Sequence, residues 1–176
     1  ICAVETDRQF RRQMMGRKEL DQAAHTDLPF ETLRHLFGFG QRNALHLRKT
    51  ADMGRKEAFQ KGLFHVQDES SQLAVKILDP QKGESIMDMC AAPGGKSFTA
   101  AEQMKNEGKL ISCDIYEHKI ELMEDGAERL GISMMECKVK DAAEKEEEHE
   151  LFDRILVDAP CSGEGMFRRN AEAAKQ

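Results

Sequence analysis

The chain has 176 residues, of which 40% are hydrophobic and 33% charged, the balance of a soluble globular domain rather than a disordered one. It has no apolar run of the roughly 18 residues that a membrane span needs and no charged-then-apolar leader, so we expect a cytoplasmic protein. Five cysteines without a C-x-x-C pair and six scattered histidines argue against a disulfide framework and a metal site.

Charge is unevenly distributed along the chain. Residues 1–62 carry 12 Lys and Arg against 8 Asp and Glu, a net charge of +4, whereas residues 63–176 carry 14 against 24, a net charge of −10. Six of these acids lie in Asp141–Glu150, which we interpret as a solvated loop. Because local basic clusters set the attraction to phosphate, the total of −6 neither supports nor excludes RNA as a partner.

The N-terminal third gives weak structural signals. Residues 1–24 are polar, with a weak helical periodicity that predicts either a helix or a frayed tail. Pro29–Gly40 has apolar residues at helical spacing, and Asn43–Arg48 predicts a short strand. We therefore divide the chain into a polar, basic segment at 1–61 and a catalytic domain at 62–176.

From Gly62 onward, strands alternate with amphipathic helices. The predicted elements are a helix capped by Asp68 and ended by Asp79-Pro80, a strand at Ser85–Met89, a helix at Ser97–Glu107, a strand at Lys109–Cys113, a helix at Glu117–Leu130, and strands at Ser133–Val139 and Phe152–Val157. This alternation predicts an α/β fold with a parallel, doubly wound sheet, and Cys113 and Cys137 are expected to pack within its strands.

Three loops at the carboxyl ends of the predicted strands carry residues suited to a ligand. Cys90–Lys96 is a run of small residues ahead of a helix N-terminus, where the backbone can approach a ligand closely. Asp114 follows the second strand and could accept hydrogen bonds from ribose hydroxyls, and Asp158–Gly163 follows the fourth strand. Their order and spacing together favour a nucleoside-type cofactor.

Two common nucleotide-binding loops are absent from the sequence, and their absence bears on which cofactor the site would take. The dinucleotide fingerprint G-x-G-x-x-G does not occur, and Gly94-Gly95-Lys96-Ser97 lacks the first glycine of a phosphate-binding loop. S-adenosylmethionine, which has no phosphates, fits this loop better than a nucleotide does.

The sequences CAAPGGK (Cys90–Lys96) and DAPCSG (Asp158–Gly163) resemble the first and fourth motifs of the Sun family, also called Fmu, of RNA cytosine-5 methyltransferases. Gly62–Pro80 resembles the bacterial 16S ribosomal RNA branch of that family, and the resemblance covers roughly residues 43–170. It implies a Rossmann-like, S-adenosylmethionine-dependent methyltransferase fold, here truncated after about the fourth central strand.

The resemblance also implies roles for individual residues. Asp114 would hold the ribose hydroxyls, Asp141 would face the adenine amino group, and Asp158 would line the methionine end and the target base. Lys96 would point at the target base or at Asp158. The methionine end and ribose would be wrapped by Cys90, Ala91, Ala92, Pro93, Gly94, Gly95 and Lys96.

A cysteine is needed because cytosine C5 is a poor nucleophile, so a thiolate must first add to C6. In the family the cysteine of the Pro-Cys motif, here Cys161, assists product release, and the nucleophile lies in a later Thr-Cys motif. No Thr-Cys occurs in this chain, which begins at Ile1 and stops at Gln176 within a continuing segment, so we expect an incomplete domain. Cys161 is assigned to the site with its role left open.

We therefore expect a methyltransferase acting on C5 of a cytosine in small-subunit ribosomal RNA, monomeric, with Arg168 and Arg169 as candidate phosphate contacts. Transfer RNA remains open as a substrate. Two alternatives also remain: a nucleotide-dependent oxidoreductase on a similar sheet, and a non-catalytic RNA-binding or assembly module with a vestigial pocket. The missing G-x-G-x-x-G argues against the first, and the intact Lys96, Asp158 and Cys161 against the second.

Overall fold

A computed structural model describes residues 2–5, 44–46, 53–144 and 151–160 of the chain. The helix predicted within Pro29–Gly40 lies outside these residues, as does most of the acidic loop. Cys161 and the pair Arg168-Arg169 also lie outside them, so their predicted roles stay predictions.

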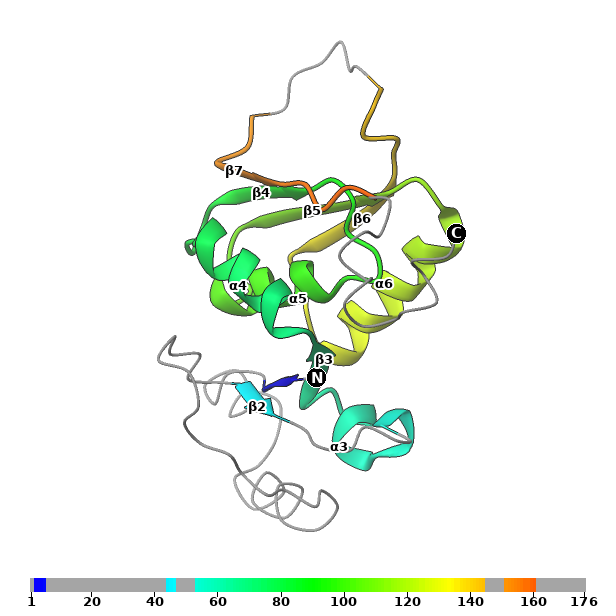
Figure 1. The fold of residues 1–176 in the computed structure, drawn as a ribbon. Helices are drawn as coiled ribbons and strands as arrows, with labels where there is room; N and C mark the ends of the chain where they lie inside the picture. The colour runs from blue at the N-terminus through cyan, green and yellow to red at the C-terminus, as the bar shows by residue number, and fades with distance from the viewer. Residues whose placement is uncertain (1, 6–43, 47–52, 145–150, 161–176) are drawn as a thin grey trace, which may run out of the picture.

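The larger sheet has four parallel strands in the order β6-β5-β4-β7. The strands are β4 (Ser85–Asp88), β5 (Lys109–Asp114), β6 (Met135–Val139) and β7 (Arg154–Leu156). The helices are α4 (Glu69–Leu78), α5 (Gly95–Gln103) and α6 (Glu117–Leu130), and all three lie on one side of this sheet (Figure 1). The predicted α/β fold with a parallel sheet is confirmed.

The boundaries of α4 and α6 follow from their capping residues. The Asp68 carboxylate accepts a 2.9 Å hydrogen bond from the Ser70 amide, and α4 ends at Asp79, whose φ of 51° lies in the left-handed region just before Pro80. Helix α6 ends at Gly131, with φ 70°. Its buried stripe is the one predicted from the sequence: Ile120, Met123, Ala127 and Leu130.

Helix α5 differs from its prediction at both ends. It begins two residues earlier, at Gly95, because Gly94 takes a positive φ and serves as its N-cap. It ends at Gln103, because Lys105 and Asn106 adopt left-handed φ values of 59° and 58°. The Asn106 side chain then accepts hydrogen bonds from the Ser133 and Met134 amides, so β6 starts two residues later than the predicted Ser133.

Alternate residues of the strands in the larger sheet face opposite sides, so its core consists of two clusters. Ile86 and Leu110 are paired neighbours that face the helices, where they pack against Ala101 and Met104 of the α5 region. The intervening residues form a second cluster, Met87, Ile111 and Cys113, on the opposite face. Cys113 is thus a core residue, as predicted.

A second, antiparallel sheet has the order β2-β1-β3, with β1 (Cys2–Glu5), β2 (Ala44–His46) and β3 (Phe64–Gln67). Strand β2 confirms the short strand predicted in Asn43–Arg48. The prediction of a helix or tail at 1–24 is wrong for residues 2–5, which pair as a strand with β3. That pairing joins segments about 60 residues apart, and local periodicity carries no signal for it.

Two short elements lead into β3: a 3-10 turn at Met53–Arg55 and α3 at Glu57–Gln60. The Arg129 guanidinium of α6 donates hydrogen bonds to the Phe59 and Phe64 carbonyls, at 2.6 and 3.2 Å, and its Cζ lies 3.8 Å from the centre of the Phe59 ring. Strand β3 is therefore held against the helical layer of the larger sheet.

Candidate cofactor and catalytic site

The site lies where the strand order of the larger sheet reverses. The chain runs from β4 through β5 to β6 in one direction, and β7 then pairs with the free side of β4. The loops after β4 and β7 are consequently neighbours, and the Met89 amide donates a 2.9 Å hydrogen bond to the Leu156 carbonyl. Such a topological switch point is where α/β sheets bind ligands.

The glycine-bearing loop after β4 is fixed by backbone contacts. The Ala91 amide donates to the Cys113 carbonyl of β5 at 2.8 Å, and the Gly94 amide donates to Ala91 at 2.7 Å. Gly94 has φ 99°, and a Cβ at this position would lie 2.5 Å from the Phe98 ring. Glycine is therefore required here both for its φ and for space, and the first free amides of α5 follow directly.

Lys96 and Asp158 meet across this switch point. The Lys96 Nζ lies 2.5 Å from Asp158 Oδ2, although 62 residues separate them in the sequence. The Lys96 side chain is 19% exposed and that of Asp158 is 58% exposed, so the pair sits at the edge of the molecule, open to a ligand. The two motifs singled out in the sequence thus meet at one edge of the sheet.

Asp88 is a site residue that the sequence analysis did not single out. It is 1% exposed, its Oδ2 accepts a 2.8 Å hydrogen bond from Ser97, and Ser97 in turn accepts one from Ser112 at 2.9 Å. Its Oδ1 has no hydrogen-bond partner within the described part of the chain. Burial raises the pKa of Asp88 to about 6, against the lowering effects of Ser97, the Cys90 amide and Lys96. Its position directly before Met89-Cys90 was the available signal.

Asp114 and Asp141 end two neighbouring strands. Asp114 is 7% exposed at the end of β5, where its Oδ1 accepts from the Tyr116 amide at 3.2 Å and lies 3.5 Å from Lys119 Nζ. Asp141 follows β6, and its Oδ1 accepts from the Ala143 amide at 2.9 Å in a tight turn. The Lys140 amide donates to the Asp114 carbonyl at 3.0 Å, which brings the two strand ends together.

Four carboxylates at or just after the strand ends act on Cys90, near the start of the glycine-bearing loop after β4. Burial raises the pKa of the Cys90 thiol, and Asp88, Asp114, Asp158 and Asp141 each raise it further. Cys90 is therefore kept as a thiol and is a poor nucleophile at neutral pH. Four carboxylates gathered at these strand ends, one of them with an unpartnered buried oxygen, suit a ligand that carries positive charge, as S-adenosylmethionine does on its sulfonium and ammonium groups.

A parallel sheet with a glycine-bearing first loop, an acid after the second strand and a switch-point site is shared by enzymes with nucleoside-type cofactors, and the S-adenosylmethionine-dependent methyltransferases are one class of them. Solved structures agree with this class. The crystal structure of PH0851 superposes with a TM-score of 0.78 at 30% identity, covering 98% of this chain and 38% of that one. NSun6 from Pyrococcus horikoshii with SFG gives a TM-score of 0.58 at 34% identity, covering 61% and 28%.

The chain belongs to the family of 16S rRNA methyltransferases RsmB/F, whose model matches residues 75–176. The probable ribosomal RNA small subunit methyltransferase B of Bacillus subtilis is 49% identical over 65% of this chain and 26% of its own length. A tRNA (cytosine(49)-C(5))-methyltransferase of Pyrococcus abyssi is 39% identical over 65% of this chain and 37% of its own. The chain thus spans about a quarter to two fifths of the length of these two relatives.

Two further observations concern the described residues alone. No helix among them has the length and apolar character to cross a membrane. Within the same residues, no three His, Cys, Asp or Glu side chains gather in a way that could hold a metal ion.

Proposed function

We propose that this chain supplies the cofactor-binding half of an enzyme that transfers a methyl group from S-adenosylmethionine to C5 of a cytosine in small-subunit ribosomal RNA. The observation that carries the proposal is the contact of Lys96 with Asp158, which joins the two motif loops at the switch point. The name of the Bacillus subtilis relative, at 49% identity, supports ribosomal RNA as the substrate.

In this proposal the cofactor, when bound, supplies an electrophilic methyl group on a positively charged sulfonium. The loop Cys90–Lys96 receives its methionine end at the N-terminus of α5, because the first amides of that helix are free to bind a carboxylate. Asp114 accepts hydrogen bonds from the ribose hydroxyls, and Asp141 receives the adenine amino group. The carboxylates also favour the charged sulfonium over the neutral thioether left after transfer, which helps product leave.

The target cytosine is proposed to lie beside Lys96 and Asp158. Asp158 is the more exposed of the two and can hydrogen-bond the base edge, while Lys96 orients the Asp158 carboxylate and offers positive charge for an RNA phosphate or base oxygen. A stacked base must be extruded to reach this position. Cys161 follows Pro160, the last described residue, and is assigned to the same site.

The cofactor assignment is tested by thermal unfolding of the chain with S-adenosylmethionine and, as control ligand, NAD. A ligand at 100 times its dissociation constant stabilises the folded state by about 2.7 kcal/mol. We expect a cooperative transition that rises with S-adenosylmethionine and not with NAD. A transition that rises with NAD alone would support the oxidoreductase alternative instead.

The substrate assignment is tested by methyl transfer with the complete protein. Labelled S-adenosylmethionine is incubated with unmodified small-subunit ribosomal RNA or with transfer RNA, and the RNA is digested to nucleosides. We expect the label in 5-methylcytidine from ribosomal RNA. Label in transfer RNA alone would favour the activity named for the Pyrococcus abyssi relative, and label on another base or on protein would overturn the proposal.

A further inference from the structure

A cluster of buried polar side chains lies outside the proposed site, beneath the first turn of α5. It comprises His65 and Gln67 of β3 and Thr99 of α5, which are 4%, 6% and 3% exposed. The Thr99 hydroxyl lies 2.7 Å from Gln67 Oε1, and His65 Nε2 lies 3.2 Å from the Thr99 oxygen. Buried polar groups are costly unless they are paired, so three of them together indicate a specific arrangement.

This cluster contacts the cofactor loop at Gly95. The Thr99 hydroxyl also lies 3.0 Å from the Gly95 carbonyl. A Cβ built at Gly95 would lie 3.6 Å from Gln67 Nε2 and 3.7 Å from its Cγ, so the Gln67 side chain lines the space beside Gly95 and reaches its carbonyl through the Thr99 hydroxyl. Gly95 stands between Gly94, the N-cap of α5, and Lys96, which contacts Asp158.

The donors and acceptors in this cluster follow from the number of protons that its side chains carry. A hydroxyl donates one proton, so Thr99 donates either to Gln67 Oε1 or to the Gly95 carbonyl at a given moment. His65 is neutral at neutral pH, because burial and then the Arg129 charge lower its pKa to about 4. With its proton on Nε2, His65 donates to Thr99 and leaves the hydroxyl proton for Gln67 or Gly95. The Gln67 Nε2 has no hydrogen-bond partner among the described residues, although it is buried.

We propose that Gln67 and Thr99 are positioning residues of the methyltransferase site, which act through Gly95 to hold the turn Gly94–Lys96 in its cofactor-binding conformation. The inference rests on the proposed function, because it takes this turn to receive the methionine end of S-adenosylmethionine. Neither residue touches the cofactor. Both residues instead restrain the backbone whose amides bind the cofactor. The free amides of α5 and the Lys96 side chain are therefore already placed before the ligand arrives.

The test compares four variants of the full 176-residue chain by calorimetric titration with S-adenosylmethionine, with the melting temperature of each unliganded variant measured alongside. Thr99→Val removes the hydroxyl and keeps the branched shape, whereas Thr99→Ser keeps the hydroxyl and removes the methyl group. Gln67→Met removes the amide, and Gln72→Met is its matched control. Gln72 is also buried, at 3%, and its Nε2 also lacks a partner in the described part of the chain, but it lies on α4.

We expect Thr99→Val and Gln67→Met each to weaken S-adenosylmethionine binding about tenfold, the scale of one lost hydrogen bond. Thr99→Ser and Gln72→Met should bind close to the wild-type affinity. Competition with 5′-methylthioadenosine, which lacks the amino-acid end, provides a second readout. Its affinity should change little in Thr99→Val, because the turn receives the methionine end.

Three results would overturn the inference while the proposed function stands. These are wild-type affinity in both Thr99→Val and Gln67→Met, an equal loss in Gln72→Met, and an equal loss for 5′-methylthioadenosine and S-adenosylmethionine. The last two would show general loosening of the core rather than control of the turn. If Thr99→Val does not melt cooperatively, the comparison of S-adenosylmethionine affinity between Gln67→Met and Gln72→Met decides whether the inference holds. A wild-type chain that binds no S-adenosylmethionine overturns the proposed function and this inference together.

Discussion

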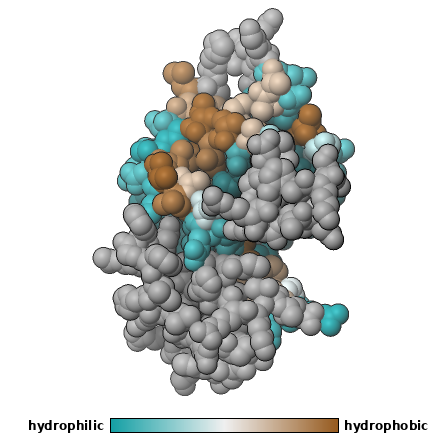
Figure 2. All heavy atoms as spheres, in the orientation of Figure 1, coloured by the Kyte–Doolittle hydropathy of each residue, from teal (hydrophilic) through white to brown (hydrophobic). Residues whose placement is uncertain are grey.

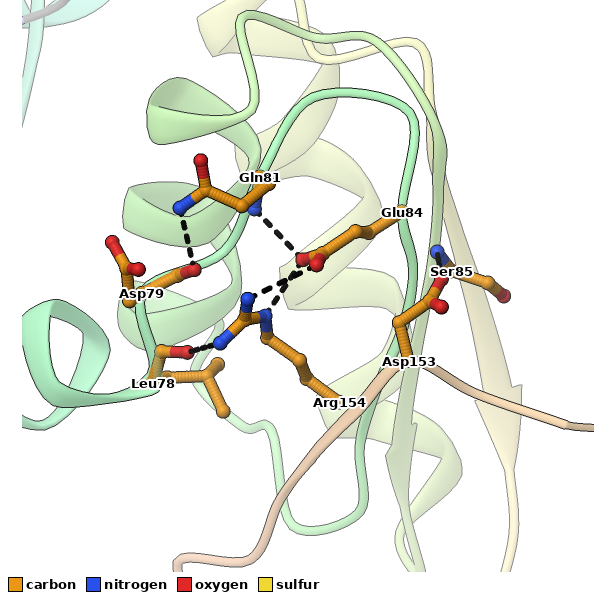
Figure 3. Close-up of polar contacts among 7 residues, drawn as sticks. All are labelled: Leu78, Asp79, Gln81, Glu84, Ser85, Asp153 and Arg154. Carbon is orange, nitrogen blue, oxygen red and sulfur yellow. Dashed lines mark hydrogen bonds and ion pairs between the residues drawn. The ribbon is translucent and has the colours of Figure 1, made fainter.

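Arg154 and Glu84 form a two-point ion pair at the opposite end of the sheet from the site (Figure 3). Arg154 Nε lies 2.7 Å from Glu84 Oε2 and Nη2 lies 3.0 Å from Oε1, while Nη1 donates to the Leu78 carbonyl at 2.6 Å. The neighbouring Asp153 accepts a 2.7 Å hydrogen bond from the Ser85 amide. These contacts fix the start of β7 beside the start of β4.

The register of β7 depends on this anchor, because β7 has three residues and, among the described strands, pairs with β4 alone. Its Ile155 is half-exposed, and Val157, which follows the strand, is too, so apolar packing holds this segment weakly. Figure 2 shows apolar side chains gathered on the upper part of the visible face. A fixed register of β7 sets where Asp158 emerges, and therefore whether it reaches Lys96.

The first prediction concerns this anchor. Arg154→Met should lower the melting temperature and speed amide hydrogen exchange in 154–157 more than in β5, because β7 loses the contacts that fix its register. The control is Lys82→Met, which breaks the exposed pair of Lys82 with Glu107 at 2.7 Å. Equal protection of β7 in Arg154→Met and wild type would show that strand pairing alone holds it.

The second prediction separates stability from activity at Lys96. Lys96→Met should change the free energy of unfolding by less than about 1 kcal/mol, because its partner Asp158 is largely exposed and such pairs contribute little. Methyl transfer by the complete protein should fall about 100-fold or more if the pair acts on the target base. The measurement is the initial rate of label transfer beside a denaturant titration. Unchanged transfer would remove Lys96 from the catalytic residues.

The third prediction tests the turn at Gly94. Gly94→Ala combines a positive φ with a Cβ placed 2.5 Å from the Phe98 ring, so it should destabilise the fold by about 2–4 kcal/mol. The matched control is Gly83→Ala, where φ is 81° but no atom lies within 4 Å of the added Cβ. That variant should lose only about 1 kcal/mol. Chemical denaturation measures both, and equal losses would show that the Phe98 ring moves aside.

The fourth prediction concerns pH. The pKa of Asp88 is raised from 3.8 to about 6, so the folded state binds more protons than the unfolded state in that range and stability falls as pH rises through it. The pKa of His65 is lowered from 6.5 to about 4, so the folded state binds fewer protons there and stability rises with pH. Each effect amounts to about 3 kcal/mol at 1.36 kcal/mol per pKa unit, and the two oppose each other between about pH 4 and 6.

Single variants should expose these opposing slopes. Asp88→Asn removes the acid and leaves only the titration of His65. The free energy of unfolding of this variant should therefore rise steeply from pH 4 to 6.5 and exceed that of wild type near pH 7. His65→Gln should show the reverse slope. Urea titrations at half-unit pH steps measure both. Parallel curves for wild type and variants would show that neither group titrates in this window.

Helices α4 and α6 were determined by local sequence. Asp68 and Pro80 bracket α4, and the apolar stripe of α6 ends at Gly131, so short-range sterics and hydrogen bonds were sufficient to place both elements. The alternation of strands and helices likewise determined the parallel sheet. The order of the loops predicted that the motifs after β4 and β7 lie at the same edge of the sheet.

The tertiary structure alone decided the contacts between distant segments. The pairing of β1 with β3 and the burial of Asp88 depend on distant segments of which the local sequence carries no sign. The same holds for Gln67 and Thr99 beneath Gly95. The physical reason is that periodicity and capping act within a few residues, whereas burial and the pairing of polar groups depend on which surfaces the completed sheet brings together.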